Sequence, residues 1–283
     1  MLNETWKKLQ NGSDIRGVAL EGIEGQSVNL TPEIVQQIAC SFAAWLAAKT
    51  DRLLSELTVA VGNDSRLSAE ALSSAVTQGL SMLGVTVVNC GLCSTPAMFM
   101  TTVMEGYKYD GSIMLTASHL PYNRNGLKFF TKDGGLEKGD ITEILELSQE
   151  KIYTRAGRPG EIRTLDFIQV YAADIVRKIR SKTGEERPLE GFRIIVDAGN
   201  GAGGFYADQV LKPPVRKEAS FWSRTAVSRT ISRIRRIKRQ WPLSGKRFWN
   251  RTQISGSYSI RMSTGQAPWI GPAGRSTVTE LSR

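Results

Sequence analysis

Leu57-Thr58-Val59-Ala60-Val61-Gly62 is a short run rich in β-branched residues that ends in glycine. Residues 68–83 then resemble a helix that Gly84 ends, and Val85-Thr86-Val87-Val88 follows as a second strand. A strand, a helix and a strand joined by short connections predict a βαβ unit with two parallel strands. This stretch therefore indicates an α/β fold, in which a mainly parallel sheet is covered by helices.

The sequence on either side extends this pattern. Thr31-Pro32-Glu33 is typical of a helix start, with threonine as the cap and proline at the first position, and apolar residues follow at helical spacing. Residues 111–116 predict a strand that leads into a polar loop, and residues 140–151 predict an amphipathic helix. Farther along we expect a linker at 157–164, a helix at 167–179 and a buried strand at 192–197. The last strand indicates the start of a second α/β domain.

Composition and charge divide the chain unevenly. The 283 residues are 41% hydrophobic, which is enough for one large or two ordinary domains. The net charge is +10, but residues 212–283 hold 16 Lys and Arg against two Glu. That segment alone carries +14, which leaves −4 on residues 1–211. The basic character therefore belongs to the last quarter of the chain.

Several classes of protein are excluded by what the sequence lacks. It has no apolar run of about 18 residues, so we expect no membrane span, and its start does not resemble a secretory signal. We therefore expect a cytoplasmic protein. The spacing of Cys90 and Cys93 is that of a redox or zinc motif, but the remaining cysteine is Cys40 and the single histidine is His119. Structural, unligated cysteines are favoured over metal or redox chemistry.

The most informative segment is Thr116-Ala117-Ser118-His119-Leu120-Pro121-Tyr122-Asn123-Arg124-Asn125-Gly126-Leu127-Lys128. Its serine follows a strand of a parallel sheet, where open α/β sheets place ligands, and the later residues supply donors for a phosphate. The segment resembles the phosphoserine loop of the α-D-phosphohexomutase family, the phosphoglucomutases and phosphomannomutases, which usually reads Thr-Ala-Ser-His-Asn-Pro with Asn-Gly-x-Lys after it. Four other pieces match family motifs in order: Gly12-Ser13-Asp14-Ile15-Arg16-Gly17, Val61-Gly62-Asn63-Asp64-Ser65-Arg66, Gly91 to Pro96 and Val196-Asp197-Ala198-Gly199-Asn200-Gly201. The resemblance covers roughly residues 11 to 211.

The resemblance implies a fold and a domain order. The fold is a three-layer α/β arrangement, with a mixed or mainly parallel sheet and helices on both faces. Residues 1–150 would form the first domain, with the phosphoserine loop, and residues 151–211 the start of a truncated second domain. Residues 212–283 would be a basic, irregular or disordered tail.

The resemblance also implies site residues. Ser118 would be the phosphoserine, which donates its phosphoryl group to a hexose phosphate and recovers one from a hexose bisphosphate. Arg16 and Lys128 match positions beside the transferring phosphoryl group, as acid/base or electrostatic partners, and His119 is placed to orient the serine. Asn125, with Arg16 and Lys128, would bind the substrate.

Two positions near this loop have other expected roles. Leu120 departs from the usual asparagine of the family's loop, which puts any polar role of that position in doubt. Asp64 and Arg66 are interpreted as a structural ion pair or a loop brace rather than as reacting groups, because such pairs often fix turns.

Magnesium is the cofactor that the resemblance implies. Mg²⁺ would be held by the Ser118 phosphoserine and by three carboxylates of an Asp-x-Asp-x-Asp-Arg loop, which is absent from the chain as written. Residues 212–283 contain no aspartate at all, so they offer no set of three carboxylates to a hard cation. We therefore expect a truncated, inactive or weakly active phosphohexomutase.

A shift of reading frame would explain the tail. Residues 257–265, back-translated and shifted by one base, become Ile-Ile-Phe-Asp-Thr-Asp-Val-Asp-Arg, which resembles the family's metal loop. Residues 221–230 shifted in the same way also resemble the family's second domain. The hypothesis is a one-base slip near Lys212 to Arg216, and stop codons in the shifted frame of the nucleotide sequence would exclude it. The alternative is an α/β domain whose Arg/Ser tail binds RNA or anionic surfaces.

Overall fold

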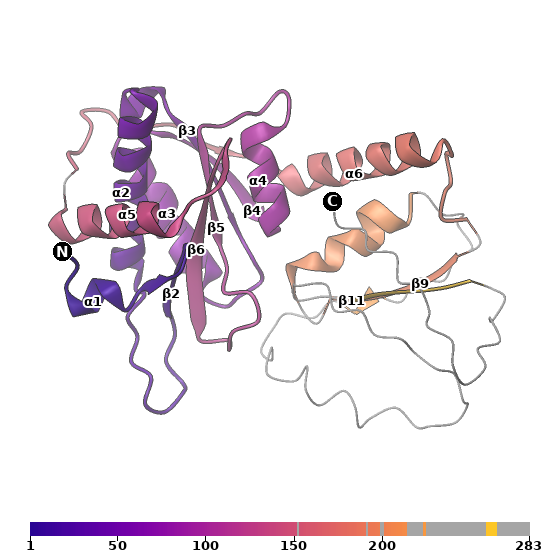
Figure 1. Ribbon diagram of the computed structural model, residues 1–283, viewed down its shortest axis with the longest axis horizontal. Helices are drawn as coiled ribbons and strands as arrows, with labels where there is room; N and C mark the ends of the chain where they lie inside the picture. The colour runs from indigo at the N-terminus through magenta and orange to yellow at the C-terminus, as the bar shows by residue number, and fades with distance from the viewer. Residues whose placement is uncertain (152, 191, 199–200, 214–222, 225–258, 265–283) are drawn as a thin grey trace. The chain divides into compact units, whose positions relative to one another are not determined.

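The structure is a computed structural model that describes residues 1–151, 153–190, 192–198, 201–213, 223–224 and 259–264 (Figure 1). The chain divides into two compact units, of which the first holds Met1–Tyr171 and the second begins at Ala172. The elements of unit 1 are α1 (Glu4–Lys7), β1 (Gln10–Asn11), β2 (Asp14–Val18), α2 (Pro32–Thr50), the 3₁₀ turn η1 (Leu54–Glu56), β3 (Thr58–Asn63), α3 (Ala69–Met82), β4 (Thr86–Leu92), α4 (Thr95–Val103), β5 (Gly111–Leu115), β6 (Arg124–Thr131), β7 (Gly134–Gly135), α5 (Lys138–Glu150) and β8 (Ile162–Thr164).

Among the described residues, unit 1 contains one sheet of eight strands, in the order β1-β2-β6-β5-β3-β4-β8 with β7 beside β6. The strands β5, β3, β4 and β8 are parallel, and the pairings among β1, β2, β6, β7 and β5 are antiparallel. The expected βαβ unit is confirmed as β3, α3 and β4. The predicted helix start at Thr31 is also confirmed, since its hydroxyl accepts a hydrogen bond from the Ile34 N–H at 3.3 Å.

Several elements were not expected from the sequence, among them β2, β6, β8 and α4. The polar segment after residue 116 is a loop only as far as residue 123, and β6 then runs between β5 and β2. Strand β6 begins with the polar residues and glycine Arg124-Asn125-Gly126, which do not give the apolar pattern that predicts a strand. Part of the expected linker 157–164 is an edge strand, β8, which pairs with β4 and extends unit 1 beyond residue 150. Helix α4 begins at the cap Ser94, which accepts from the Ala97 N–H at 3.4 Å.

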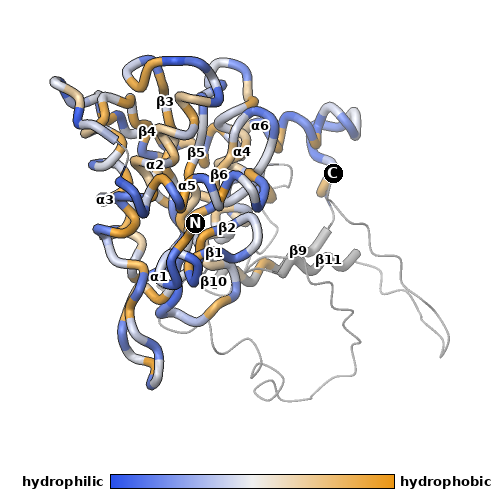
Figure 2. The backbone as a smooth tube through the Cα atoms, turned by 60° about the vertical axis from the view of Figure 1, so that its left-hand side comes forward, coloured by the Kyte–Doolittle hydropathy of each residue, from blue (hydrophilic) through white to orange (hydrophobic). Residues whose placement is uncertain are grey.

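Helices cover both faces of the sheet. On one face Ile113 and Leu115 of β5 join the main apolar core with residues of α2, α3 and α5 (Figures 1 and 2). The alternate residue Ser112 faces the other side, where its hydroxyl donates to the Met98 carbonyl of α4 at 2.8 Å. The predicted three-layer α/β arrangement is thereby confirmed.

The described part of unit 2 is smaller. Its elements are the greater part of α6 (Phe167–Thr183), β9 (Phe192–Asp197), the 3₁₀ turn η2 (Ala202–Gly204), the π-helical η3 (Tyr206–Leu211), β10 (Ser223–Arg224) and β11 (Ser259–Thr264). The predicted helix and strand at 167–179 and 192–197 are confirmed. Strand β9 has β10 parallel on one side and β11 antiparallel on the other. The rest of residues 214–283 lies outside the described residues. The expected disorder of the tail and the reading-frame hypothesis concern this part of the chain.

Candidate active site at the end of strand β5

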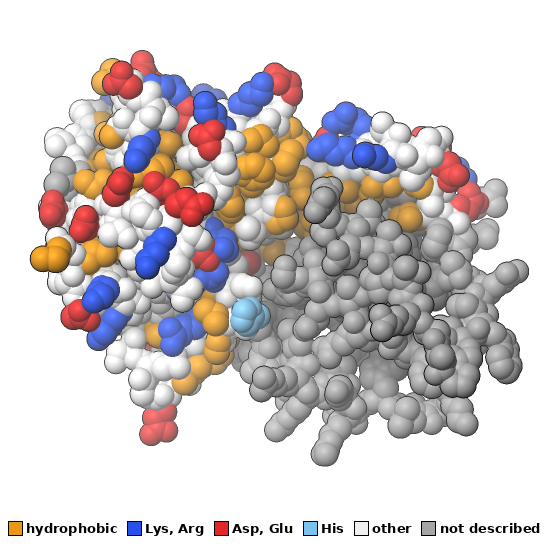
Figure 3. Space-filling view, viewed as in Figure 1, with side chains coloured by type: hydrophobic (Ala, Val, Ile, Leu, Met, Phe, Trp, Pro, Cys, Tyr) orange, Lys and Arg blue, Asp and Glu red, His pale blue; other side chains and the backbone are white. Residues whose placement is uncertain are grey.

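The segment that follows β5, residues 116–123, is named here the Ser118 loop. Ser118 has a φ of +54°, in the left-handed region that non-glycine residues seldom adopt. Its N–H donates to the Thr116 hydroxyl at 3.1 Å, and its Oγ lies 3.4 Å from Nδ1 of His119. Ser118 is half-buried and His119 is exposed, so the histidine reaches the surface in Figure 3. The hydroxyl therefore lies at the solvent edge of the sheet, beside an imidazole.

One cation, Arg16, contacts this loop, and it shares a carboxylate with a second cation, Lys128. Lys128 Nζ contacts both oxygens of Asp14 at 2.6 Å, and Arg16 Nη2 donates to Asp14 Oδ2 at 2.9 Å. The other guanidinium nitrogen of Arg16 donates to the Thr116 carbonyl at 2.9 Å. Because two cations face one anion, the cluster has one excess positive charge for a phosphate.

The register of β2 and β6 produces this cluster. Asp14 and Arg16 alternate along β2, so their side chains project to one face. Ile15 lies opposite Leu127 in the antiparallel pair, which places Asp14 beside Lys128. The sequence did not indicate Asp14 as a site residue, although its position two residues before Arg16 on a strand is a signal for a shared face.

Gly126 lets Arg16 lie across β6. The two residues are partners in the β2–β6 pair. A Cβ on Gly126 would be 2.2 Å from the Ile15 carbonyl oxygen and 2.7 Å from Cδ of Arg16, which is too close for either atom. The absence of a side chain at this position therefore gives the arginine its path toward Thr116.

Asn125 lies in the interior of the protein. It is fully buried, its amide nitrogen donates to the Ser68 hydroxyl at 2.9 Å, and its Oδ1 accepts from the Gly126 N–H at 2.8 Å. Both ends of the amide thus have partners inside the protein. This placement suits a residue that shapes the start of β6, whereas the family resemblance assigns Asn125 to substrate binding.

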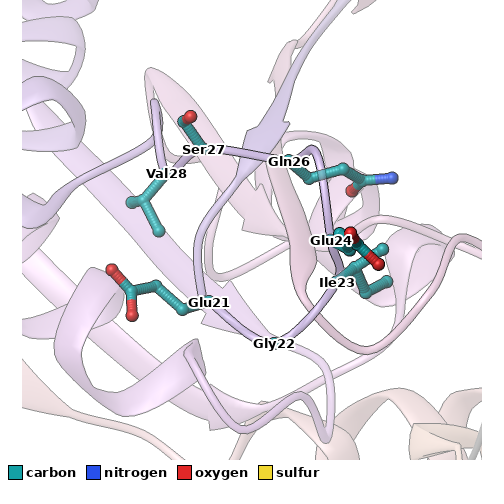
Figure 4. A pocket seen from close by; sticks show the side chains of 7 residues that line it. All are labelled: Glu21, Gly22, Ile23, Glu24, Gln26, Ser27 and Val28. Atoms are coloured by element: carbon teal, nitrogen blue, oxygen red, sulfur yellow. The ribbon is translucent and has the colours of Figure 1, made fainter.

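The loop between β2 and α2 contacts the Ser118 loop from another side. The Asn123 amide donates to Oε1 of Gln26 at 3.0 Å, and the Asn123 carbonyl accepts from the N–H groups of Ala19 and Leu20. This loop encloses a shallow depression of about 570 Å³ (Figure 4). Its lining residues are Glu21, Gly22, Ile23, Glu24, Gln26, Ser27 and Val28. Two carboxylates oppose a phosphate ligand, so the depression is a poorer candidate than the Ser118 edge.

Asp64 and Arg66 stand behind the Ser118 loop. Asp64 Oδ2 accepts from the Thr116 hydroxyl at 2.8 Å and from Nε of Arg66 at 3.2 Å. Burial raises the pKa of the Asp64 carboxyl above its usual range, and the neighbouring Arg66 opposes this effect. The pair contacts the loop from inside, as a brace does. Thr116 connects Asp64 to Ser118; the sequence analysis placed it in the loop motif but gave it no role.

The described residues do not fit the expected magnesium site. Across the described ranges, no group of three or more His, Cys, Asp or Glu side chains lies close enough together to hold a metal ion. Ser118 offers one hydroxyl oxygen, and Mg²⁺ requires several oxygen ligands in an octahedral arrangement. We therefore derive no chemical step through the metal.

The cysteines are buried and uncharged. Burial raises the pKa of the Cys40 and Cys93 thiols to about 12 and also raises the pKa of Cys90. Since the thiolate is the metal ligand and the nucleophile, these side chains pack as small apolar groups. In the described part of the chain, no helix is long and apolar enough to cross a membrane.

Comparison with known proteins agrees with the fold. Residues 7–155 match the family model of phosphoglucomutase/phosphomannomutase, alpha/beta/alpha domain I. A phosphoglucosamine mutase of Nautilia profundicola is 32% identical over 64% of this chain and 40% of the relative. A phosphoglucomutase of Neisseria meningitidis is 32% identical over 68% of this chain and 38% of the relative.

A solved structure shares the fold. A phosphoglucomutase/phosphomannomutase family protein from Burkholderia thailandensis has a TM-score of 0.58 and 24% identity, over 76% of this chain and 44% of that one. The chain thus spans about two fifths of the length of the curated relatives that it matches. The family model covers more than half of this chain. The chain belongs to the phosphoglucomutase/phosphomannomutase family of α-D-phosphohexomutases.

Proposed function

We propose that Ser118 is the phosphoryl carrier of a hexose phosphate mutase. The observation that carries the proposal is the position of its hydroxyl, at the solvent edge of the sheet, next to a loop that the Arg16 and Lys128 cluster contacts. The family membership of the chain supports this chemistry, because its relatives are named as phosphoglucosamine mutase and phosphoglucomutase.

The proposed reaction has two half-steps. In the first, Ser118 Oγ forms a bond to phosphorus of a hexose bisphosphate, and the bond between phosphorus and the sugar oxygen breaks. The serine proton leaves toward Nδ1 of His119, and the sugar oxygen takes up a proton as the alcohol is released. In the second half-step, a hydroxyl oxygen of a hexose phosphate forms a bond to the phosphorus of the phosphoserine and loses its proton. The bond between phosphorus and Ser118 Oγ breaks, and Oγ takes up a proton, which restores the serine. The net result moves phosphate between positions 1 and 6 of the sugar.

Arg16 and Lys128 supply positive charge to this transfer. A phosphate dianion resists attack by an alcohol, so fixed cations stabilise the transition state more than the ground state. Asp14 holds both cations in place through contacts of 2.6 to 2.9 Å. We propose that Asn125 acts behind them, by fixing the start of β6 through Ser68.

We further propose that this chain performs the first half-step slowly and the complete cycle weakly. Residues 212–283 contain no aspartate, and the described residues contain no group of three or more side chains that could hold a metal ion. Each missing electrostatic element of a transition-state site costs about 10²-fold in rate or more. The substrates we propose are a hexose phosphate and a hexose bisphosphate.

The test is transfer of one phosphoryl group to the protein. The full chain is incubated with glucose 1,6-bisphosphate, and intact mass and peptide sequencing by mass spectrometry locate the phosphate. We expect it on Ser118 and expect none in Ser118→Ala. The matched control is Ser27→Ala, which removes an exposed serine outside the Ser118 loop and leaves the transfer unchanged. Transfer to another residue, or equal labelling of Ser118→Ala, would contradict the proposal.

A further inference from the structure

The Arg66 side chain is the most completely hydrogen-bonded polar group near Ser118. It is buried, with 1% of the side chain exposed, and a guanidinium has five N–H donors. Its Nε donates to Asp64. The terminal nitrogens donate to four main-chain carbonyls of the segment after β5, at 2.8 to 2.9 Å: Ser118, Leu120, Pro121 and Arg124. Every donor of the guanidinium therefore has an acceptor, and four of the five acceptors belong to one loop and its exit.

These bonds reach both backbone polar groups of the reactive serine. The Ser118 carbonyl accepts from Arg66, and the Ser118 N–H donates to the Thr116 hydroxyl. That hydroxyl in turn donates to Asp64, the ion-pair partner of Arg66. A closed network thus surrounds a residue whose φ is +54°. Such a backbone conformation persists in a non-glycine residue only where its surroundings hold it.

No other side chain reproduces this set of contacts. Lysine has three donors on one nitrogen and lacks the planar fork of arginine, so at least two of the five acceptors would lose their bond. A buried ion pair also contributes little net stability, because desolvation offsets the attraction of its charges. The arrangement is better explained by the geometry that it imposes than by the stability that it adds.

We propose that Arg66, through Asp64 and Thr116, is a positioning residue that holds Ser118 in the left-handed conformation from which its hydroxyl receives the phosphoryl group. Arg66 touches no substrate in this proposal. It acts on the reaction through the backbone of the Ser118 loop. The inference rests on the proposed function for its rate effect, but its effect on the loop is measurable without any activity.

The experiment compares Arg66→Lys with the wild-type full chain. The first readout is hydrogen exchange over residues 116–126, which reports the loop whether or not Ser118 reacts. The second is the initial rate of Ser118 phosphorylation by glucose 1,6-bisphosphate, divided by the folded fraction. The matched control is Arg52→Lys, because Arg52 also donates to a carboxylate, that of Asp110, and to a carbonyl, and Asp110 precedes β5 whereas the Ser118 loop follows it.

In Arg66→Lys we expect exchange in the loop to rise at least about tenfold and phosphorylation to fall about 10²-fold, since small displacements of a reacting group cost that much. Arg52→Lys leaves both unchanged. Methylguanidinium added to Arg66→Ala restores part of the rate, which a purely structural role would not predict. If Arg66→Lys does not fold, Thr116→Val replaces it, because it cuts the link from Asp64 to the Ser118 N–H.

The outcomes separate the two proposals. Unchanged loop exchange and unchanged phosphorylation in the folded variant would overturn the positioning role. A wild-type chain that takes no phosphate would overturn the proposed function, and loop exchange alone would then decide the role of Arg66. Slower phosphorylation with faster loop exchange in the Arg66 variant supports both.

Discussion

Gly126→Ala is expected to disturb the site through the sheet rather than through a lost functional group. The new Cβ would lie 2.2 Å from the Ile15 carbonyl oxygen, which is a backbone atom of β2. An ordinary contact between carbon and a carbonyl oxygen is about 3.3 Å or more, so β2 and β6 must separate locally by about 1 Å. A rotamer change does not relieve the clash, because the obstructing atom belongs to the main chain.

The cost follows from this displacement. Overpacking in a tight interior costs about 1–3 kcal/mol, and the same shift lengthens the 2.9 Å bond from Arg16 to the Thr116 carbonyl beyond hydrogen-bond range. With a loss of about 3 kcal/mol in total, Tm should fall by about 6–12 °C for a unit of this size. Phosphorylation of Ser118 should fall about 10²-fold in the molecules that remain folded.

Thermal unfolding followed by circular dichroism measures the first effect, and the phosphorylation assay measures the second. The matched control is Gly139→Ala in α5, where a Cβ meets no atom within 4 Å. That variant should be neutral or more stable by about 0.4–1 kcal/mol. A Gly126→Ala protein with an unchanged Tm would show that β2 and β6 are not packed as described.

Three further expectations concern stability and reactivity. Asn125→Ala removes the hydrogen-bond partner of the buried Ser68 hydroxyl and of the Gly126 N–H. Urea unfolding should therefore show that the free energy of unfolding falls by about 1–3 kcal/mol, and no loss would contradict the buried placement of Asn125. With pKa values of about 12, Cys40 and Cys93 should react with Ellman's reagent about 10³-fold more slowly in the folded chain than in urea, and fast reaction of the folded chain would contradict their burial. The raised pKa of Asp64 means that the folded state favours its protonated form, so this group contributes stability below about pH 3.9 that is lost as pH rises through the folded pKa. As pH rises from about 3.9 through the folded pKa, the unfolding free energy of the wild type minus that of Asp64→Asn should therefore fall. A difference independent of pH would contradict a raised pKa of Asp64.

The parallel strands β3, β4 and β5 were predictable because they carry their own signals. Residues 57–62 and 85–88 are nearly continuous runs of apolar or β-branched residues, as expected for strands that are buried on both faces. The helix between them, α3, ends just before Gly84, whose φ is +85°. The observed strands Thr58–Asn63 and Thr86–Leu92 lie close to the expected ranges. Here local pattern and tertiary burial favour the same structure.

The antiparallel half was not predictable, because its strands carry the charged residues and glycines of the candidate site. Strand β2 is Asp14-Ile15-Arg16-Gly17-Val18 and β6 begins with Arg124-Asn125-Gly126, so charged and glycine residues occupy positions that usually hold β-branched ones. Their polar side chains have partners on neighbouring strands and loops, which a single sequence does not display. The family motif indicated Arg16 and Lys128, but only the strand register shows that Asp14 links them.

Ser118 follows β5, the strand at which the parallel and antiparallel halves of the sheet join. Strand β5 pairs parallel with β3 and antiparallel with β6, so the chain that leaves β5 must turn back at the edge where β3 also ends. The turn therefore receives Asp64 and Arg66 from the end of β3, and it receives the Arg16 and Lys128 cluster from the antiparallel strands. A purely parallel sheet would supply only the first pair, and an antiparallel hairpin only the second. The mixed topology is what places a braced backbone and an excess of positive charge beside one serine.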